Sequence, residues 1–361
     1  MPVHICFRIN MDVRIICFAL CAQSADGLPE FSMSRIVGFS QYGGPEVLEF
    51  LDVVVPEPAK NEVRIKVKAI GLNRAESMWR TGKYVEEVRL PARLGYECAG
   101  FVDAIGSEVT HVAVGDRVST VPSFSLNDYG MYGEVVLAPA HAAVKLPDFV
   151  SFADATAIWN PLITPYSAFI ESKLLKPSDV VLIPAASSSV GLGAIQVVNS
   201  VGATSVALTR SSAKRDELLK AGAAHVIATD EQDLVAEVNR ITNNKGADIV
   251  FEPVGGPNFS KLLEALTPGG TVLIFGALSE EPTELPMLAV ILRTPIIRGF
   301  NLFGTTTDPV RQRAATDYIF DGLKSGVFKT QVTKTFQFDD IVEAHRELEK
   351  NQHLGRMVVN V

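Results

Sequence analysis

The sequence predicts an α/β protein with two parts, one rich in β-strands and one built on a doubly wound parallel sheet. Two observations carry this prediction. Residues 34–147 form short alternating segments separated by turn residues, and from Val180 onward apolar runs alternate with amphipathic ones. Polar–apolar alternation is typical of half-buried strands, whereas apolar strands separated by amphipathic helices are typical of βαβ units. The 361 residues are enough for two domains of ordinary size.

Composition excludes several classes of protein. Hydrophobic residues make up 47% of the chain and charged residues 20%, as in globular proteins, and the formal net charge is −8. A nucleic-acid-binding surface would need a basic patch, so we expect no nucleic-acid partner. No apolar run reaches the roughly 18 residues needed to span a bilayer, so we expect no membrane partner. Three of the four cysteines lie within the first 21 residues, which argues against a disulfide framework and for a cytoplasmic protein.

Residues 1–32 are expected to be a disordered N-terminal extension ahead of Met33. The segment "IICFALCA" followed by "QSA" weakly resembles a secretion signal, which stays open as an alternative. Charged residues Arg8, Asp12 and Arg14 interrupt the pattern, and we expect this segment to carry no catalytic chemistry.

The strands of the β-rich part are expected within residues 61–73, 97–109, 115–121 and 133–147. In the second part, five apolar runs predict parallel strands: "VVLIP", "SVALT", "HVIAT", "DIVFE" and "TVLIF". Helices are predicted over residues 190–202, 212–223 and 308–326. We expect residues 121–133 and 277–294 to be loops that shape a substrate pocket and the contacts between subunits.

The first βα turn of the parallel sheet predicts a phosphate site. Strand "VVLIP" is followed by "AASSSVGLG", in which the dinucleotide pattern G-x-G-x-x-G becomes Ala186-x-Ser188-x-x-Gly191. Small residues let the backbone approach a pyrophosphate, and the free N–H groups and dipole of the helix N-terminus attract it. The candidate contacts in this turn are Ala186, Ser188, Ser189, Val190 and Gly191. A well-packed βα loop without a ligand is the alternative.

The end of the next strand indicates which nucleotide binds. An acidic residue about 20 positions after the last glycine would bind the ribose 2′-hydroxyl of NAD. Arg210 stands there instead, nineteen residues after Gly191, and Lys214 follows closely. A guanidinium can pair with the 2′-phosphate of NADP, so these residues favour NADPH as the cofactor. Lys214 is alternatively a solvated charge at a helix start.

Several segments in order resemble the medium-chain dehydrogenase/reductase superfamily, in its zinc-free quinone oxidoreductase and enoyl reductase branch. They are "FSQYGGPEVLEF", "AIGLNRAESMWRTGKY", "LGYECAGFVDAIGSEVTHVAVGDRV", "AASSSVGLGAIQ", "GADIVFEPVGG", "LTPGGTVLIFGAL" and "LGRMVVNV". The resemblance implies a GroES-like catalytic domain of residues 33–157 and 302–361, a Rossmann NADP-binding domain of residues 158–301, and a homodimer or homotetramer.

The resemblance also locates the positions that hold catalytic zinc in the alcohol dehydrogenases of this superfamily. Here they hold Asn73, Tyr96 and Asn160, and only Glu97 remains as a carboxylate. Neither Asn nor Tyr is an adequate zinc ligand, so we expect no catalytic metal.

Conjugate reduction needs no metal, because hydrogen-bond donors can stabilise the charge that moves onto an oxygen. Tyr84 lies eleven residues after Asn73, at the spacing of the active-site tyrosine in the enoyl reductases that the segment resembles. We expect Tyr84 to donate a proton and Asn73 to bind the nicotinamide ribose or the substrate oxygen. A loop-capping Tyr84 and a structural Asn73 are the alternatives. Glu76 and Arg80 are expected to form a local ion pair.

Further cofactor contacts are implied by the resemblance alone. They are Gly276, Leu278, Asn301, Phe303 and Arg356, of which Arg356 replaces the more usual Lys and is expected to keep the positive charge.

The expected function is NADPH-dependent transfer of hydride to a quinone or an α,β-unsaturated carbonyl, a small-molecule substrate. Two alternatives stay open: a zinc-type alcohol dehydrogenase with altered ligands, and a non-catalytic NADPH-binding protein.

Overall fold

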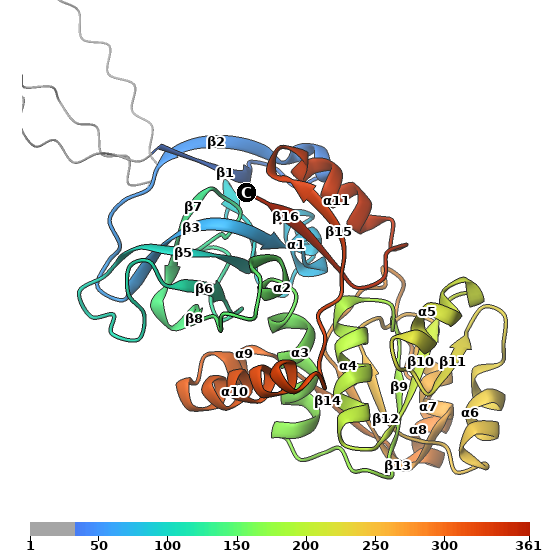
Figure 1. The fold of residues 1–361 in the computed structure, drawn as a ribbon. Helices are drawn as coiled ribbons and strands as arrows, with labels where there is room; N and C mark the ends of the chain where they lie inside the picture. Colours follow the sequence, from blue (N-terminus) through green and yellow to red (C-terminus); the bar gives the residue numbers. More distant parts are fainter. Residues whose placement is uncertain (1–32) are drawn as a thin grey trace, which may run out of the picture.

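The computed structural model describes residues 33–361, and the predicted N-terminal extension therefore lies outside the described residues. Two parts lie side by side, each with its own sheet system (Figure 1). The α/β prediction, with one β-rich part and one parallel sheet, is confirmed.

The β-rich part combines a seven-stranded sheet with a three-stranded one. The larger sheet has the order β15-β16-β3-β5-β6-β8 with β7 paired to β3, and the smaller has the order β2-β1-β4. Its elements are β1 (Met33–Phe39), β2 (Glu49–Val54), β3 (Glu62–Gly71), α1 (Arg74–Arg80), β4 (Ala92–Arg93), β5 (Glu97–Ile105), β6 (Arg117–Thr120), β7 (Val135–Pro139), β8 (Ala143–Lys145), α2 (Phe152–Ala155), β15 (Val332–Gln337), α11 (Ile341–Glu349) and β16 (Arg356–Asn360). The C-terminal strand β16 thus lies between β15 and β3 and brings the two ends of the described chain into one sheet.

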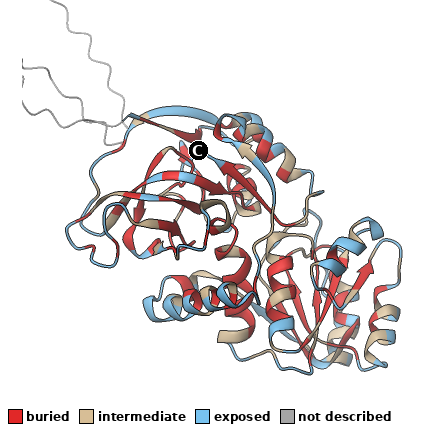
Figure 2. Ribbon diagram, viewed as in Figure 1, coloured by how far each residue is buried: buried red, intermediate tan, exposed pale blue. Residues whose placement is uncertain are grey.

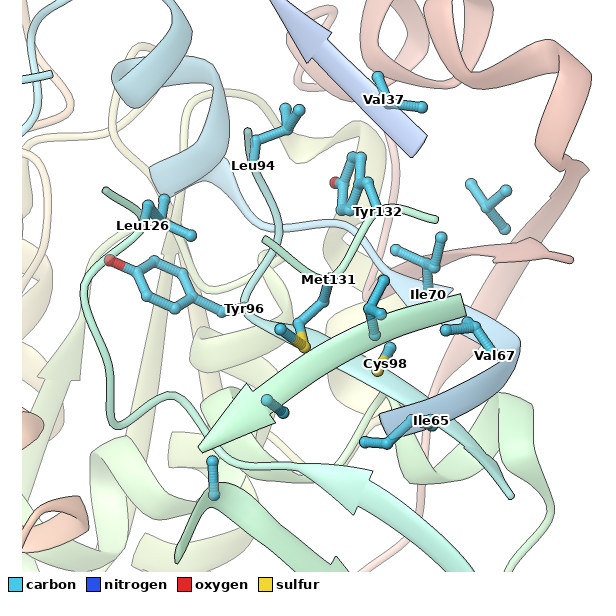
Figure 3. Close-up of a cluster of buried hydrophobic side chains, with 14 of the residues drawn as sticks. Val37, Ile65, Val67, Ile70, Leu94, Tyr96, Cys98, Leu126, Met131 and Tyr132 are labelled. Atoms are coloured by element: carbon cyan, nitrogen blue, oxygen red, sulfur yellow. The ribbon is translucent and has the colours of Figure 1, made fainter. Parts of the chain in front are cut away.

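Strand β3 illustrates why these residues form a sheet. Its side chains alternate between buried and more exposed along most of its length, as the polar–apolar alternation of the sequence requires. The buried side chains join the core of this part, where Ile65, Val67 and Ile70 pack with residues of neighbouring strands and loops (Figure 3). Tyr96 and Tyr132 lie in the same cluster.

The second part is a six-stranded parallel sheet with the order β11-β10-β9-β12-β13-β14, the doubly wound arrangement. Its elements are β9 (Val180–Ile183), α4 (Ser189–Ser200), β10 (Thr204–Thr209), α5 (Arg215–Lys220), β11 (His225–Ala228), α6 (Leu234–Thr242), β12 (Ala247–Glu252), α7 (Phe259–Glu264), β13 (Leu266–Ile274), α8 (Met287–Arg293) and β14 (Ile296–Gly299). The interior strands are buried on both faces (Figure 2), which explains their continuous apolar runs.

Three helices lie where the two parts meet: α3 (Trp159–Pro165), α9 (Phe303–Thr306) and α10 (Pro309–Ser325). Helix α3 continues into a π-helical turn over Tyr166–Glu171. It touches α4 so closely that a side chain at Gly193 would collide with the Pro161 carbonyl oxygen. The β9–α4 turn is therefore anchored against the element that joins the parts.

One prediction about loops was partly wrong. Residues 277–294, expected to be a loop, contain helix α8 over Met287–Arg293. The apolar residues Leu288, Ile291 and Leu292 stand at helical spacing, a signal that was available in the sequence.

Candidate active site

The turn between β9 and α4 brings the backbone of a strand end close to the first turn of a helix. Ser188 caps α4, its Oγ accepting a hydrogen bond from the Gly191 N–H at 3.0 Å. A Cβ on Gly191 would stand 2.7 Å from the Ala185 carbonyl oxygen and from the Ala186 Cα, so only glycine fits there. Ala185 itself takes a left-handed φ of 48°. The turn is thus as tight as a phosphate-binding turn.

The remaining predicted turn residues lie in the same place. Ala186 is fully buried, whereas Ser189 and Val190 form the first turn of α4 and are half-buried. The positive end of the α4 dipole and the first N–H groups of this helix therefore lie at the carboxyl edge of the parallel sheet, where anions are favoured.

Two cations lie at the end of β10, beside this turn. The Lys214 ammonium donates to Ser187 Oγ at 3.1 Å and to the His353 carbonyl oxygen at 2.9 Å. Burial lowers the pKa of Lys214, and the positive charge of Arg210 lowers it further. Arg210 is exposed, and its guanidinium has no hydrogen-bond partner within residues 33–361. The two charges are close enough to repel each other, which an anion between them would relieve.

The other candidate contacts follow the strand ends, where ligands of doubly wound sheets bind. Gly276 and Leu278 come just after β13, and a Cβ on Gly276 would stand 2.7 Å from the Pro253 carbonyl oxygen. Asn301 comes after β14, and its Oδ1 accepts from the Phe303 N–H at 2.9 Å. The Phe303 ring packs edge-on against Tyr96 of the β-rich part, with centroids 6.0 Å apart. Phe303 thereby packs against the core of the β-rich part.

Asn73 lies at the centre of a buried polar network. Its Oδ1 accepts from Asn160 Nδ2 at 2.7 Å and from Arg356 Nη1 at 2.6 Å. Its Nδ2 donates to Glu97 Oε2 at 3.0 Å and to Glu76 Oε1 at 3.2 Å. An amide side chain has two acceptor and two donor positions, so the hydrogen-bonding capacity of Asn73 is filled.

Arg356 belongs to the same network. Its backbone follows Gly355, whose N–H donates to the Ser187 carbonyl oxygen of the β9–α4 turn at 2.9 Å. Its guanidinium, however, is only 2% exposed; it forms an ion pair with Glu97 and donates to the Thr156 carbonyl oxygen at 2.9 Å. The charge expected at this position is present, but it faces the carboxylate in the interior.

The local ion pair expected between Glu76 and Arg80 does not form. Glu76 accepts instead from Tyr132 Oη at 2.5 Å and from the Asn73 and Tyr96 N–H groups at 2.7 and 3.1 Å. Burial raises the pKa of Glu76, and these hydrogen bonds oppose the rise by stabilising the charged form. Arg80 pairs with Glu349 of α11. Each of the two side chains therefore bonds to partners distant in the sequence, and the ion pair that their helical spacing predicted is replaced.

The positions expected to lack zinc ligands carry this network. Asn73 is saturated, Glu97 is neutralised by Arg356, and the side chain of Tyr96 is turned toward another tyrosine. Zinc is held by Cys, His or carboxylate groups with free lone pairs, so this set of donors does not fit the ion. Within residues 33–361, no three His, Cys, Asp or Glu side chains are grouped as metal ligands.

Tyr84 lies at the edge of the aromatic core beside this network. Its ring packs edge-on against Trp79 with centroids 6.0 Å apart, and its hydroxyl oxygen accepts from Tyr96 Oη at 3.3 Å. Burial raises the pKa of the half-buried Tyr84, so its phenol is neutral at physiological pH. The sequence did not predict this contact between Tyr84 and Tyr96, because it gives only the position of each residue along the chain.

Comparisons with known proteins give the family. The family model described as "Alcohol dehydrogenase GroES-like domain" matches residues 59–148, and that described as "Zinc-binding dehydrogenase" matches residues 189–316. Quinone oxidoreductase of Homo sapiens is 32% identical over 317 residues, covering 88% of this chain and 94% of that protein. Quinone oxidoreductase 1 of Escherichia coli (strain K12) is 32% identical over 331 residues, covering 90% and 98%.

A solved structure agrees with these relatives. The Escherichia coli quinone oxidoreductase complexed with NADPH superimposes with a TM-score of 0.84 at 30% identity, covering 91% of this chain and all of that one. The two sheets, the βα turn and the relatives together lead to one assignment. This chain is a member of the medium-chain dehydrogenase/reductase superfamily and belongs to its quinone oxidoreductase family.

Proposed function

We propose that this protein is an NADPH-dependent oxidoreductase that reduces quinones or α,β-unsaturated carbonyls without a metal. One observation carries the proposal: Arg210 and Lys214 crowd two positive charges beside the tight β9–α4 turn, where the 2′-phosphate of NADP would neutralise them. Membership of the quinone oxidoreductase family supports the reaction class.

The cofactor would be held at the carboxyl edge of the parallel sheet. The N–H groups of the first turn of α4 would take the pyrophosphate, since Gly191 leaves its path free. Arg210 would take the 2′-phosphate directly, while Lys214 would have to exchange a carbonyl partner for it. When bound, NADPH supplies a hydride to the substrate.

On the substrate side, we assign proton donation to Tyr84. Its hydroxyl hydrogen has no acceptor within residues 33–361, and the phenol stays protonated at neutral pH, so it can donate to a developing enolate.

Asn73 is assigned a positioning role. Because all its hydrogen-bonding positions are used, it would hold Asn160, whose side chain is half-buried and retains an unused N–H. Asn160 would therefore present this unused side-chain N–H to a ligand bound beside the Asn73 network.

The proposal is tested by measuring NADPH consumption with benzoquinones, naphthoquinones, enones and enoyl thioesters. We expect turnover with at least one of these classes and a loss of about 100-fold in kcat in Tyr84→Phe, within the range for a removed general acid. Tyr318→Phe is a matched control, since its hydroxyl bonds to Ser200, at the end of α4 opposite the β9–α4 turn. Rates across the panel no higher than those of Tyr84→Phe would favour a non-catalytic NADPH-binding protein.

We further propose a homodimer formed through the edge of β14 that pairs with no strand within residues 33–361. Strand β14 ends the sheet order, and Leu288, Ile291 and Leu292 of the neighbouring α8 lie mostly in solvent on one helix face. An unpaired edge beside an apolar face is a template for a second copy, which a two-fold axis would place antiparallel. Leu288→Glu should yield monomers in analytical ultracentrifugation. The same change at exposed Leu219 of α5 should leave the mass unchanged; a wild-type monomer would contradict the dimer.

A cytoplasmic location is also proposed. Among residues 33–361, no helix is long and apolar enough to cross a bilayer. Cys98 is a buried free thiol, as is usual in reducing compartments. Fractionation of cells producing the full chain tests this; recovery from the medium would contradict it.

A further inference from the structure

Two tyrosine hydroxyls meet at the candidate site. Tyr96 Oη donates to Tyr84 Oη at 3.3 Å, and within residues 33–361 neither hydroxyl has another hydrogen-bond partner. The two phenols therefore form a short chain with a defined direction. Tyr96, the inner phenol, donates its hydrogen to Tyr84, the outer phenol. The hydroxyl hydrogen of Tyr84 therefore stays free within residues 33–361.

The inner phenol is firmly held. Tyr96 is 3% exposed, its N–H donates to Glu76 Oε1, and its carbonyl oxygen accepts from Thr120 Oγ1 at 2.9 Å. Its ring packs against Phe124 and Phe303 with centroids 5.7 and 6.0 Å away. It lies beside Leu126 in the aliphatic and aromatic core (Figure 3).

The outer phenol lies nearer the surface. Tyr84 is half-buried, and its ring packs edge-on against the ring of Trp79. Trp79 is itself held in place, because its indole N–H donates to the Arg93 carbonyl oxygen at 2.9 Å. Burial raises the pKa of Tyr84, whereas the hydrogen bond from Tyr96 lowers it. A donor aimed at a phenol oxygen stabilises the phenolate more than the phenol, because hydrogen bonds to ionised acceptors are stronger.

We propose that Tyr96 is a positioning residue for proton delivery by Tyr84. This inference rests on the proposed function. When the hydride and its electron pair reach the substrate, the negative charge moves to the substrate oxygen. The O–H bond of Tyr84 then breaks and its proton passes to the reduced substrate. The Tyr84 phenolate is held by the Tyr96 hydrogen bond until water returns a proton.

The kinetic test compares Tyr96→Phe with Tyr318→Phe. The control removes a phenol hydroxyl from another aromatic cluster, since Tyr318 packs on Tyr166 and Phe328 and its hydroxyl bonds to Ser200. With a quinone or enone that the wild type reduces, Tyr96→Phe should lower kcat by roughly 10- to 100-fold at unchanged KM, the effect of one charge-assisted hydrogen bond. Tyr318→Phe should match the wild type. In a Tyr84→Phe background, Tyr96→Phe should have no further effect.

The pH profile separates positioning from packing. Tyr84 must be protonated to act, so activity is lost as the pH rises through its pKa. Removing the Tyr96 hydroxyl removes a donor to the phenolate, so the alkaline limb of kcat should move to higher pH. An unmoved limb, or a loss of kcat that persists in the Tyr84→Phe background, would overturn the proposal.

A titration without substrate keeps this inference distinct from the proposed function. The ionisation of Tyr84 is measured as the difference in tyrosinate absorbance between each protein and its Tyr84→Phe counterpart, with circular dichroism confirming that the proteins stay folded. A higher midpoint in Tyr96→Phe supports the hydrogen bond even if no substrate is turned over. Equal midpoints contradict it, whatever the activity.

Discussion

The site has a nucleotide half, around the β9–α4 turn, and a buried half, around the polar network of Asn73. Two arginines show how differently these halves are built. Arg210, at the end of β10, is exposed and has no side-chain partner within residues 33–361. Arg356, at the start of β16, is buried and bonds to Glu97, Asn73 and Thr156. The first has its hydrogen-bonding capacity free for a ligand, whereas the second has spent it on the protein. The same residue type is therefore free for a ligand in one place and holds the structure together in the other.

The largest test of this comparison removes the buried charge. Arg356→Met leaves the Glu97 carboxylate without its partner in the interior, which should cost about 3–5 kcal/mol in the free energy of unfolding. Urea unfolding followed by circular dichroism measures it. Adding Glu97→Gln to this variant should restore part of the loss, because the unpaired charge is then gone. A loss below about 1 kcal/mol, the range of exposed pairs, would contradict a buried network.

A smaller effect is expected in the nucleotide half. Gly191→Ala places a Cβ 2.7 Å from backbone atoms of Ala185 and Ala186, so the turn must shift, at a cost of about 1–3 kcal/mol. The binding of NADPH should weaken with it, as measured by fluorescence titration. Gly299→Ala is the control, because no atom lies within 4 Å of its new Cβ. Equal NADPH affinity in the two variants would show that the turn does not approach the cofactor.

The smallest effect concerns pH and the buried half. His345 is fully buried beside Tyr132, neither ring nitrogen has a hydrogen-bond partner within residues 33–361, and burial lowers its pKa to about 3. In the unfolded chain the His345 imidazole takes up a proton near pH 6.5, whereas in the folded protein it stays neutral down to lower pH. The contribution of His345 to the free energy of unfolding is therefore complete above pH 6.5. It falls as the pH drops toward 3, by at most about 1.4 kcal/mol per pH unit. His345→Leu should flatten the dependence between pH 7 and 5 in urea unfolding. An unchanged slope would contradict a neutral, unpartnered imidazole.

The nucleotide half could be predicted from the sequence because its signals are local. The strand, the small residues of the turn, Gly191 and Arg210 lie within 31 consecutive residues, from Val180 to Arg210, and the parallel sheet follows from the same alternation. The contacts of these residues with a cofactor remain predictions.

The buried half could not be predicted in the same way. Arg356 and Asn73 are 283 residues apart, and Asn160 and Asn73 are 87 apart, so no spacing rule connects them. Tyr132, expected in a pocket-forming loop, instead holds Glu76 in the core. Strand β14 was not predicted because it is short. Its four residues are exposed, and Pro295 precedes them.

The most direct test of the account is the cofactor preference of Arg210→Ala with a quinone that the wild type reduces. The wild type should have a higher kcat/KM with NADPH than with NADH. The variant should lose roughly 10- to 100-fold with NADPH, the effect of one charged hydrogen-bonding partner, and little with NADH. Lys220→Ala, which removes an exposed charge at the end of α5, should behave as the wild type. A wild type that uses NADH as well as NADPH, or an Arg210→Ala variant with unchanged preference, would contradict the account.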